Sequence, residues 1–529
     1  MRFTASRSAA SRFAAPLFST PLFSAPFFSA PFVAAPLAAL VVAVAALHAP
    51  SVDAGPRAKP SASAAPRETR IGDAALAVAA DLRERALQDR TSWSVVESLT
   101  TEVGPRLAGS DADARAVRWA EAKFEALGYD KVWLEEVSFP KWVRRSERGE
   151  VLGDHAQPLT LTALGGSVGG TVDAEVVRFA DLAALEAAPA GSLAGKIAFV
   201  DYAMTRARDG SGYGPGSRVR GRGPSAAIRA GASGFLMRSA GTDSHRNPHT
   251  GITRYEDGLT PIPAAALSVP DADQLARLIA LGKPLRVRMA LDCGWDGTAI
   301  SHNVIGEVTG SRAPKKSAAT QGDASDVVVI GGHLDSWDLG TGAIDDGAGI
   351  AITMAAGHLI AALPKAQRPP RTIRVIAFAN EEQGLYGGKA YAERYAAAVA
   401  KHQIVAESDF GAGRIYAFNS NAAPQAQGAI AQIAEALKPL GIERSAKGGP
   451  GPDVGPIAEK GAIWGWLAQD GTDYFDLHHT PDDTLDKIDP AALAQNTAAY
   501  AVFAYLAASA DGSFGSAPKA PAPPAAPAR

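Results

Sequence analysis

The sequence predicts an α/β protein with a mainly parallel mixed sheet and helices on both faces. In the C-terminal half, short apolar runs rich in valine and isoleucine alternate with helical segments, which is typical of strands that are buried on both sides. Histidine or acidic residues follow several of these runs directly. Open α/β sheets bind ligands at the carboxyl ends of their strands, so these polar residues are candidates for a functional site.

The length allows more than one domain, and the hydrophobic content is sufficient for sizeable cores. Of its 529 residues, 47% are hydrophobic, and the formal net charge is −3. The 52 basic and 55 acidic residues form no basic block in the body of the chain, which argues against nucleic acid or a charged membrane surface as a partner. The single cysteine, Cys293, excludes a disulfide framework and is expected to be a core residue.

Residues 1–54 have the features of a signal peptide. Arginines precede an uncharged stretch that ends in the compact apolar segment 37–47 and a small-residue Val-Asp-Ala sequence. We expect cleavage after Ala54, with an uncleaved anchor as the alternative. Prolines at regular intervals from Pro16 to Pro36 would break a membrane-spanning helix. The mature protein is therefore predicted to be secreted or periplasmic, without a membrane span.

The mature chain divides into segments that differ in composition and in hydrophobic pattern. Its predicted parts are a linker (55–71), the first part of the main domain (72–139), an insert domain (140–300), the rest of the main domain (301–510) and a disordered tail (511–529). The insert has short strands between glycine-rich turns and one expected helix at 224–232. Its histidines His245 and His249 are expected to form hydrogen bonds, with metal ligation as the alternative.

The central stretch is 326–349, with the sequence DVVVIGGHLDSWDLGTGAIDDGAG. Its valine and isoleucine run predicts a buried strand, and His333 stands just past the end of that strand. The following loop adds the aspartates Asp335, Asp338, Asp345 and Asp346 before a helix expected at 347–362. A loop with this many carboxylates repels itself unless a cation is bound.

Further acids and a histidine follow other predicted elements. A strand at 372–379 ends in Glu381 and Glu382, a strand at 403–408 ends in Asp409, and His479 lies in the loop HHTPDDT. Imidazole and carboxylate groups suit zinc, and the number of carboxylates suits two ions that share one of them. The remaining expected elements are strands at 414–418 and 462–468 and helices at 386–399, 425–438 and 490–508.

A family resemblance rests on the sequences GGHLDSWDLGTGAIDDGAG, NEEQGLYG, ESDFG, NPHTGITRYEDGL and DYFDLHHTPDDT. Together they resemble the co-catalytic di-zinc exopeptidases of the bacterial leucyl aminopeptidase type, and in particular the plasma glutamate carboxypeptidase branch. The resemblance covers roughly residues 90–508 and implies a zinc exopeptidase acting on small peptides, with two zinc ions per chain and a homodimer. GKIAFV and AIRAGASGFL resemble the β-rich protease-associated domain that some of these peptidases carry as an insert. That domain is expected to bind no metal itself.

By position in these motifs, the resemblance implies a role for each site residue. The implied metal ligands are His333, Asp345, Glu382, Asp409 and His479. Asp345 would bridge the ions, His333 and Asp409 would complete one ion, and Glu382 and His479 the other. Glu381 would be the general base, and Asp335 the acceptor that fixes the ring of His333.

Alternatives remain open at several positions. Asp346 is expected to cap the following helix, and His478 to pack beside His479. Side chains that would line a substrate pocket, or belong to ordinary loops, are Trp337, Asp338, Asp453 and Tyr474. The segments around the metal offer no lone arginine to anchor a substrate carboxylate, so the end of the peptide that is trimmed stays open. The resemblance favours a carboxypeptidase or dipeptidase, and the alternatives are an aminopeptidase and a non-catalytic, receptor-like binding protein.

Overall fold

The computed structural model describes residues 68–312 and 326–517, so the predicted signal peptide lies outside the described residues. The helices are α1 (Asp73–Gln88), α2 (Thr91–Ser98), α3 (Asp111–Ala126), α4 (Leu182–Glu186), α5 (Tyr213–Arg229), α6 (Val269–Ile279), α7 (Ala348–Ala361), α8 (Tyr386–Arg394), α9 (Gln427–Leu437), α10 (Gly455–Glu459), α11 (Tyr474–Leu477) and α12 (Pro490–Ser509). None of the helices in the described ranges is long and apolar enough to cross a membrane.

The strands are β1 (Lys131–Val151), β2 (Gln157–Leu159), β3 (Leu161–Ala163), β4 (Gly170–Phe179), β5 (Ile197–Val200), β6 (Gly234–Arg238), β7 (Ala264–Leu267), β8 (Arg286–Val308), β9 (Val328–His333), β10 (Ile373–Phe378), β11 (Ile404–Glu407), β12 (Ile415–Ser420), β13 (Glu443–Arg444) and β14 (Gly465–Gln469). They form an 11-stranded sheet and a 3-stranded sheet. The predicted α/β class is confirmed.

Parallel strands at the centre of the main domain carry the predicted site. β9 pairs with β10 on one side and with β11 on the other, both in parallel. Successive side chains point to opposite faces, so Val328 and Ile330 pack into a core with α7 and α12, while Val329 packs with α8 and α10. The prediction that these strands are covered by helices on both faces is confirmed.

The predicted strands at 414–418 and 462–468 lie in the smaller sheet. β12 and β14 pair antiparallel, and β13 joins β12 in parallel. Just before β14, Trp464 forms an isolated parallel bridge with Val405 of β11. The expected extension of the parallel sheet is therefore wrong for β12. The reason is the short connection from β11 to β12, because a parallel crossover in the same sheet needs a dozen or more residues.

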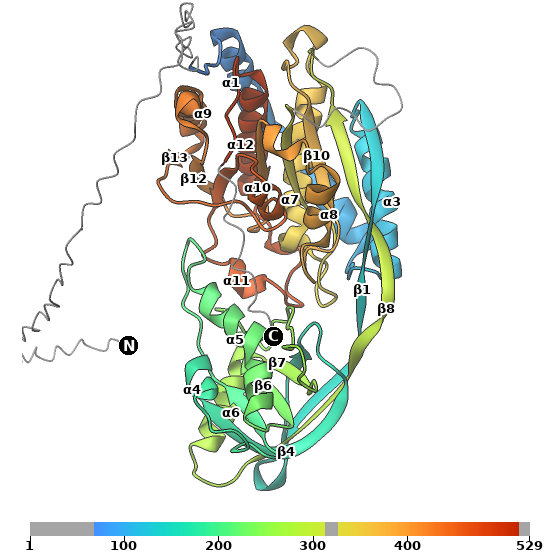
Figure 1. Cartoon of the computed structure of the whole chain (residues 1–529), viewed down its shortest axis with the longest axis vertical. Coiled ribbons are helices and arrows are strands. Elements are labelled where there is room, and N and C mark those ends of the chain that lie inside the picture. Colours follow the sequence, from blue (N-terminus) through green and yellow to red (C-terminus); the bar gives the residue numbers. More distant parts are fainter. Residues whose placement is uncertain (1–67, 313–325, 518–529) are drawn as a thin grey trace, which may run out of the picture. The chain divides into compact units, whose positions relative to one another are not determined.

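Two long strands join the main domain to the insert. β1 and β8 pair antiparallel from Lys131 opposite Glu307 to Val151 opposite Val287. β8 also pairs with β10 in the main domain and with β4 in the insert, so one sheet runs through both parts. Figure 1 shows β1 and β8 passing side by side between the two groups of elements. The predicted boundaries at 140 and 300 fall inside these strands.

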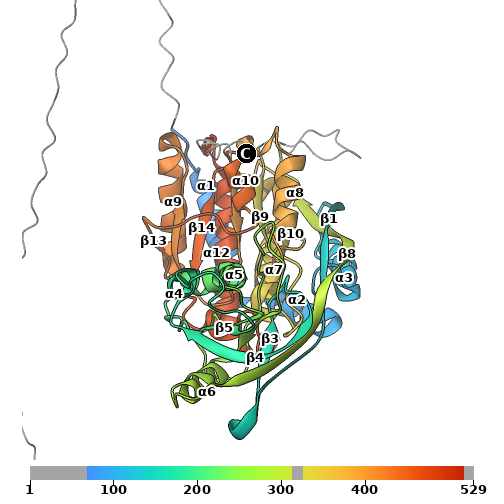
Figure 2. The ribbon, with the colours of Figure 1, turned by 60° about the horizontal axis from the view of Figure 1, so that its bottom comes forward.

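The insert contains helices as well as strands. β4, β5, β6 and β7 form a parallel row, and Figure 2 shows β4 curving along β8. Helix α5 begins at Tyr213, well before the predicted start at 224, and Pro224 lies inside it. Glycine and proline disfavour helices, and the first part of α5 is rich in both, so the sequence did not predict a helix there. Gly223 is needed there because a Cβ atom would lie 2.4 Å from the ring of Phe235.

Several smaller expectations about the chain can be compared with the structure. Cys293 is a core residue as predicted, and burial raises the pKa of its thiol to about 11.

The predicted disordered tail does not begin at residue 511, because Phe514 is buried and its N–H donates to Gln403 Oε1 at 3.2 Å. The N–H of Arg70 donates to Asp511 Oδ1 at 2.8 Å, so the two ends of the described chain meet.

Candidate metal centre

The predicted ligands meet at the carboxyl ends of the parallel strands. His333 is the last residue of β9, Glu382 follows β10, and Asp409 follows β11. Asp345 lies in the short turn η3 (Ala343–Gly347) that precedes α7, and His479 lies just after α11. Parallel strands end at the same edge of a sheet, so the local sequence is sufficient to bring most of these side chains together.

Asp345 lies between two groups of possible metal ligands. Its Oδ1 is 3.2 Å from His333 Nε2, and Asp409 Oδ1 is 3.5 Å from the same nitrogen. Its Oδ2 is 3.2 Å from His479 Nε2, which is also 2.9 Å from Glu382 Oε2. None of these side chains is more than 9% exposed. A carboxylate placed between two imidazoles has the position that a bridge between two cations requires.

Buried carboxylate oxygens that accept no hydrogen bond indicate that these residues fit a cation. Asp345 Oδ2 and Glu382 Oε1 accept no hydrogen bond from the described residues. The ligand atoms of His333, Asp345 and Asp409 lie within 4.8 Å of one another, and so do those of Asp345, His478 and His479. Burying several carboxylates together is costly, and a divalent cation would offset their negative charge.

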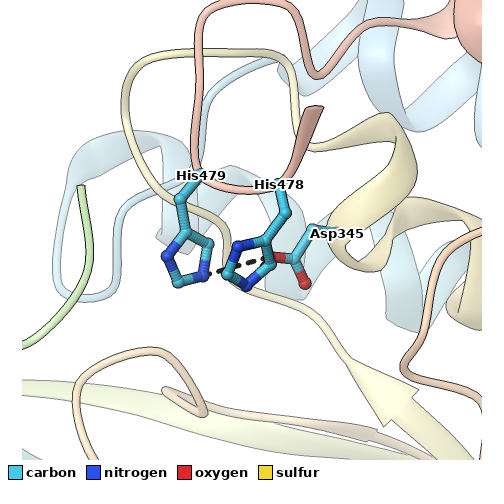
Figure 3. A group of neighbouring side chains, drawn as sticks. All are labelled: Asp345, His478 and His479. Atoms are coloured by element: carbon cyan, nitrogen blue, oxygen red, sulfur yellow. Dashed lines mark ion pairs between the residues drawn. The ribbon is translucent and has the colours of Figure 1, made fainter. Parts of the chain in front are cut away.

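His478 packs against His479 and is also a possible metal ligand. Figure 3 shows its ring beside that of His479, with both rings next to the Asp345 carboxylate. The ring centroids are 3.4 Å apart, and His478 Nε2 is 3.6 Å from Asp345 Oδ2. Burial and the neighbouring His479 lower the pKa of His478 well below its usual range. His478 is thus the packed neighbour that the sequence predicts and also a neutral imidazole near the same carboxylate.

The charges of the cluster strongly influence one another. Burial opposes ionisation of Asp345, but the nearby His333 and His479 hold the pKa of Asp345 well below its usual range. Burial lowers the pKa of His479, but Glu382 and Asp345 outweigh burial and raise it to about 10. Burial raises the pKa of Glu381 well above its usual range, and nearby carboxylates add to the shift. Glu381 therefore holds a proton more readily than an ordinary glutamate does.

Main-chain groups orient the first histidine. Nδ1 of His333 is 3.0 Å from the carbonyl oxygen of Asp335, whereas the nearer carboxylate oxygen of Asp335 is 3.8 Å away. The predicted residue is in place, but the accepting atom is its backbone oxygen, because the carboxylate accepts the N–H of Glu381 at 3.0 Å. Asp346 accepts the N–H of Gly349 at 3.0 Å in the first turn of α7, as the capping prediction requires.

Two supports of the site were not identified from the sequence. Asp483 accepts the N–H groups of Ile344 at 2.6 Å and of Asp345 at 3.2 Å, so it fixes the turn that holds the shared carboxylate. Thr250 of the insert has its carbonyl oxygen 3.2 Å from His479 Nδ1, and its N–H donates to the His479 carbonyl at 3.1 Å. The acidic pair in HHTPDDT could have indicated a role for Asp483. The contact of Thr250 is made by its main chain, so the sequence contains nothing that indicates it.

The insert histidines have the hydrogen-bonding roles that the sequence predicts. His249 Nε2 lies 2.6 Å from Asp243 Oδ2, and both side chains are buried. His245 Nδ1 lies 2.9 Å from Asp482 Oδ2. Neither histidine belongs to a group of possible metal ligands within the described ranges.

A cavity of about 470 Å³ opens onto the cluster. Its lining includes Asp345, Glu381, Glu382, Asp409 and His479, together with Tyr474, for which a pocket role was one of two expectations. Trp337, Asp338 and Asp453 are not part of this lining, and Asp338 pairs instead with Arg144 at 3.0 Å. A cavity of this size suits a small organic molecule such as a short peptide.

The parallel sheet with histidines and carboxylates at its strand ends is the arrangement of a metal-dependent hydrolase, and comparisons with known proteins agree. The family model described as "Peptidase family M28" matches residues 313–504. Carboxypeptidase Q of Mus musculus is 31% identical over 414 residues, which cover 78% of this chain and 84% of the mouse protein. Carboxypeptidase Q of Homo sapiens is 30% identical over 419 residues, with the same shares. The chain belongs to peptidase family M28 and is a metallopeptidase.

Solved structures share the fold. A Peptidase M28 precursor from Shewanella amazonensis is 47% identical, with a TM-score of 0.79, and the match covers 83% of this chain and 98% of that one. An aminopeptidase from Aneurinibacillus sp. strain AM-1 is 21% identical, with a TM-score of 0.53, and the match covers 80% of this chain and 95% of that one. The predicted family is thus confirmed, and the alternative of a non-catalytic binding protein is not supported.

Proposed function

We propose that this chain is an exported zinc exopeptidase that removes terminal residues from small peptides, as a carboxypeptidase or dipeptidase. The observation that carries the proposal is the position of Asp345 between His333 with Asp409 and His479 with Glu382. Imidazole and carboxylate donors of this kind suit zinc. The relatives called carboxypeptidase Q support release of a residue from the carboxyl end.

In this proposal each residue has one task. Asp345 would be shared by two zinc ions, His333 and Asp409 would hold one, and Glu382 and His479 would hold the other. Bound there, the ions would activate water and polarise the peptide carbonyl. The carboxylate of Glu381, which lines the cavity beside Glu382, accepts a proton from the attacking water and returns it to the leaving amine. The carbonyl of Asp335 and that of Thr250 keep the two imidazole rings in place.

An aminopeptidase is the second candidate. Glu407 lines the cavity, and its Oε1 is buried without a hydrogen-bond partner among the described residues. Its Oε2 accepts the N–H groups of Asp453 and Val454, so Oε1 is the oxygen that could accept the ammonium group of a peptide.

Metal analysis of the dialysed protein tests the proposal. We expect two zinc ions per chain, and loss of zinc from both positions in Asp345→Asn, because both ions share that carboxylate. Asp338→Asn is the matched control in the same loop, since Asp338 faces Arg144 rather than the cavity, and it should retain both ions. One ion or none in the wild-type protein, with activity unchanged by a chelator, would contradict the proposal.

Export and dimer formation are further parts of the proposal with separate tests. N-terminal sequencing of protein from its native compartment should begin after Ala54, and an intact Met1 would favour a retained anchor. Sedimentation analysis should give twice the mass of one chain, and a monomer at micromolar concentration would contradict the homodimer.

A further inference from the structure

Helix α5 of the insert brings a buried arginine to the wall of the cavity. Arg220 is 8% exposed and lines the same cavity as Asp345 and Glu381. It is the only lysine or arginine among the described residues of that lining, whose other charged members are acids and histidines. Arginine side chains are rarely buried this deeply unless they are paired, so the partners of Arg220 need to be identified.

The guanidinium group has almost no partners of its own. In residues 68–312 and 326–517 it forms no ion pair, and its Nε is buried without a hydrogen-bond acceptor. Its Nη1 donates to the carbonyl of Thr250 at 3.4 Å, and the ring of Tyr213 lies 5.5 Å away. A guanidinium carries five N–H donors in a fixed fork, so most of its capacity is unused.

The backbone around Arg220 leaves room for this group next to the metal cluster. A Cβ atom at Gly251, where φ is +132°, would lie 2.4 Å from Cζ and Nη1 of Arg220, so only glycine fits there. The Thr250 carbonyl that Arg220 contacts is the one that faces His479 Nδ1. Arg220 thus lies on the His479 side of the cluster. The carbonyl oxygen of Thr250 contacts both residues.

We propose that Arg220 binds the free carboxylate of the peptide substrate. The inference rests on the proposed exopeptidase function and decides between its two candidates. A guanidinium and a carboxylate form paired, charge-assisted hydrogen bonds, which an amide or a longer chain does not replace. A substrate held in this way presents its carboxyl end to the cavity, so the inference favours release of the C-terminal residue.

The test compares a dipeptide that has a free carboxylate with the same dipeptide as its C-terminal amide. The wild-type enzyme should prefer the free acid by about 10- to 100-fold in kcat/KM, the usual weight of a hydrogen bond to a charged group. Arg220→Met should lose this preference, because its rate on the free acid falls much further than its rate on the amide. Arg220→Lys should retain part of the preference because it keeps the charge. Arg218→Met, an exposed position in the same helix, is the matched control and should behave as wild type.

Specific outcomes would overturn the assignment. Equal rates on acid and amide in the wild-type enzyme, or an unchanged preference in Arg220→Met, would exclude Arg220 as the anchor. Cleavage of neither substrate would contradict the proposed function instead. If Arg220→Met does not fold, the wild-type preference and its reduction in Arg220→Lys decide the question.

Discussion

The main domain and the insert contribute to the site in different ways. In the main domain His333, Glu382 and Asp409 stand at or directly after strand ends, so the sheet itself places them. The insert contributes the Thr250 carbonyl and Arg220, which are held by contacts between segments far apart in the sequence. The main domain supplies imidazoles and carboxylates, and the insert supplies the one arginine or lysine side chain of the described lining. The insert therefore contacts one candidate metal ligand, His479, through a main-chain oxygen.

The largest expected effect is in the main domain, at two adjacent glutamates. Glu381→Gln removes the group that carries the proton, so turnover should fall by about 10²- to 10⁴-fold while the zinc content stays the same. Glu382→Gln replaces an anionic oxygen with a neutral amide, so zinc should be lost and excess zinc should restore part of the rate. Zinc content and turnover are measured for both variants. Equal zinc loss in both, or loss in Glu381→Gln alone, would show that the two roles are reversed.

A smaller effect, on stability, is expected at the ion pair between Arg144 of β1 and Asp338 of the main domain. The side chain of Arg144 on β1 is 7% exposed and lies 3.0 Å from both Asp338 and Glu147. Arg144→Met would leave two carboxylates without their partner, so the free energy of unfolding should fall by about 3 kcal/mol. Urea denaturation followed by fluorescence gives this value.

The neighbouring position provides the control for that measurement. Arg145 pairs with Asp292 at 3.3 Å, and both side chains are more than half exposed. Exposed pairs contribute little, so Arg145→Met should change the free energy of unfolding by less than about 0.5 kcal/mol. Similar losses in the two variants would mean that Arg144 does not fasten the insert through its ion pairs.

The smallest effect is expected at Cys293 in the insert. Burial raises the pKa of this thiol to about 11, so little thiolate is present at pH 8. Iodoacetamide should leave the native protein unmodified and fully active, and should alkylate Cys293 only in urea, as mass spectrometry would show. Rapid alkylation of the native protein would contradict a purely structural role in the insert.

The sequence was sufficient for the parts of the site that depend on local structure. Glu381 and Glu382 follow an apolar strand, and His333 ends another, so hydrophobic pattern and strand-end chemistry predict where they meet. Asp346 was correctly assigned to the start of α7, because its distance to Gly349 is set by three residues of chain. The sequence also favoured Asp335 as the support of His333 but not the atom involved, since backbone and carboxylate oxygens of one residue compete for the same donor.

The parts that were missed depend on tertiary contacts. β1 contains Pro140 and several charges, so nothing in its pattern shows a strand that continues across a domain boundary. Arg220 lies among glycines that predict a loop, and its burial follows only from the packing of α5 against its neighbours. Thr250 acts through its main chain, where the identity of the side chain carries no information.

The antiparallel pairing of β1 with β8 also sets an order of events during synthesis. Lys131 lies opposite Glu307, so the ladder closes only after the entire insert has been made. β10 pairs with the edge of β8. The strands that carry the site can therefore join the sheet only after β8, the last strand of the insert, has been made. Contacts between residues so far apart form slowly because long loops must close. A nascent chain arrested within the insert would hold most of β1 as an unpaired strand, which is the form most exposed to aggregation.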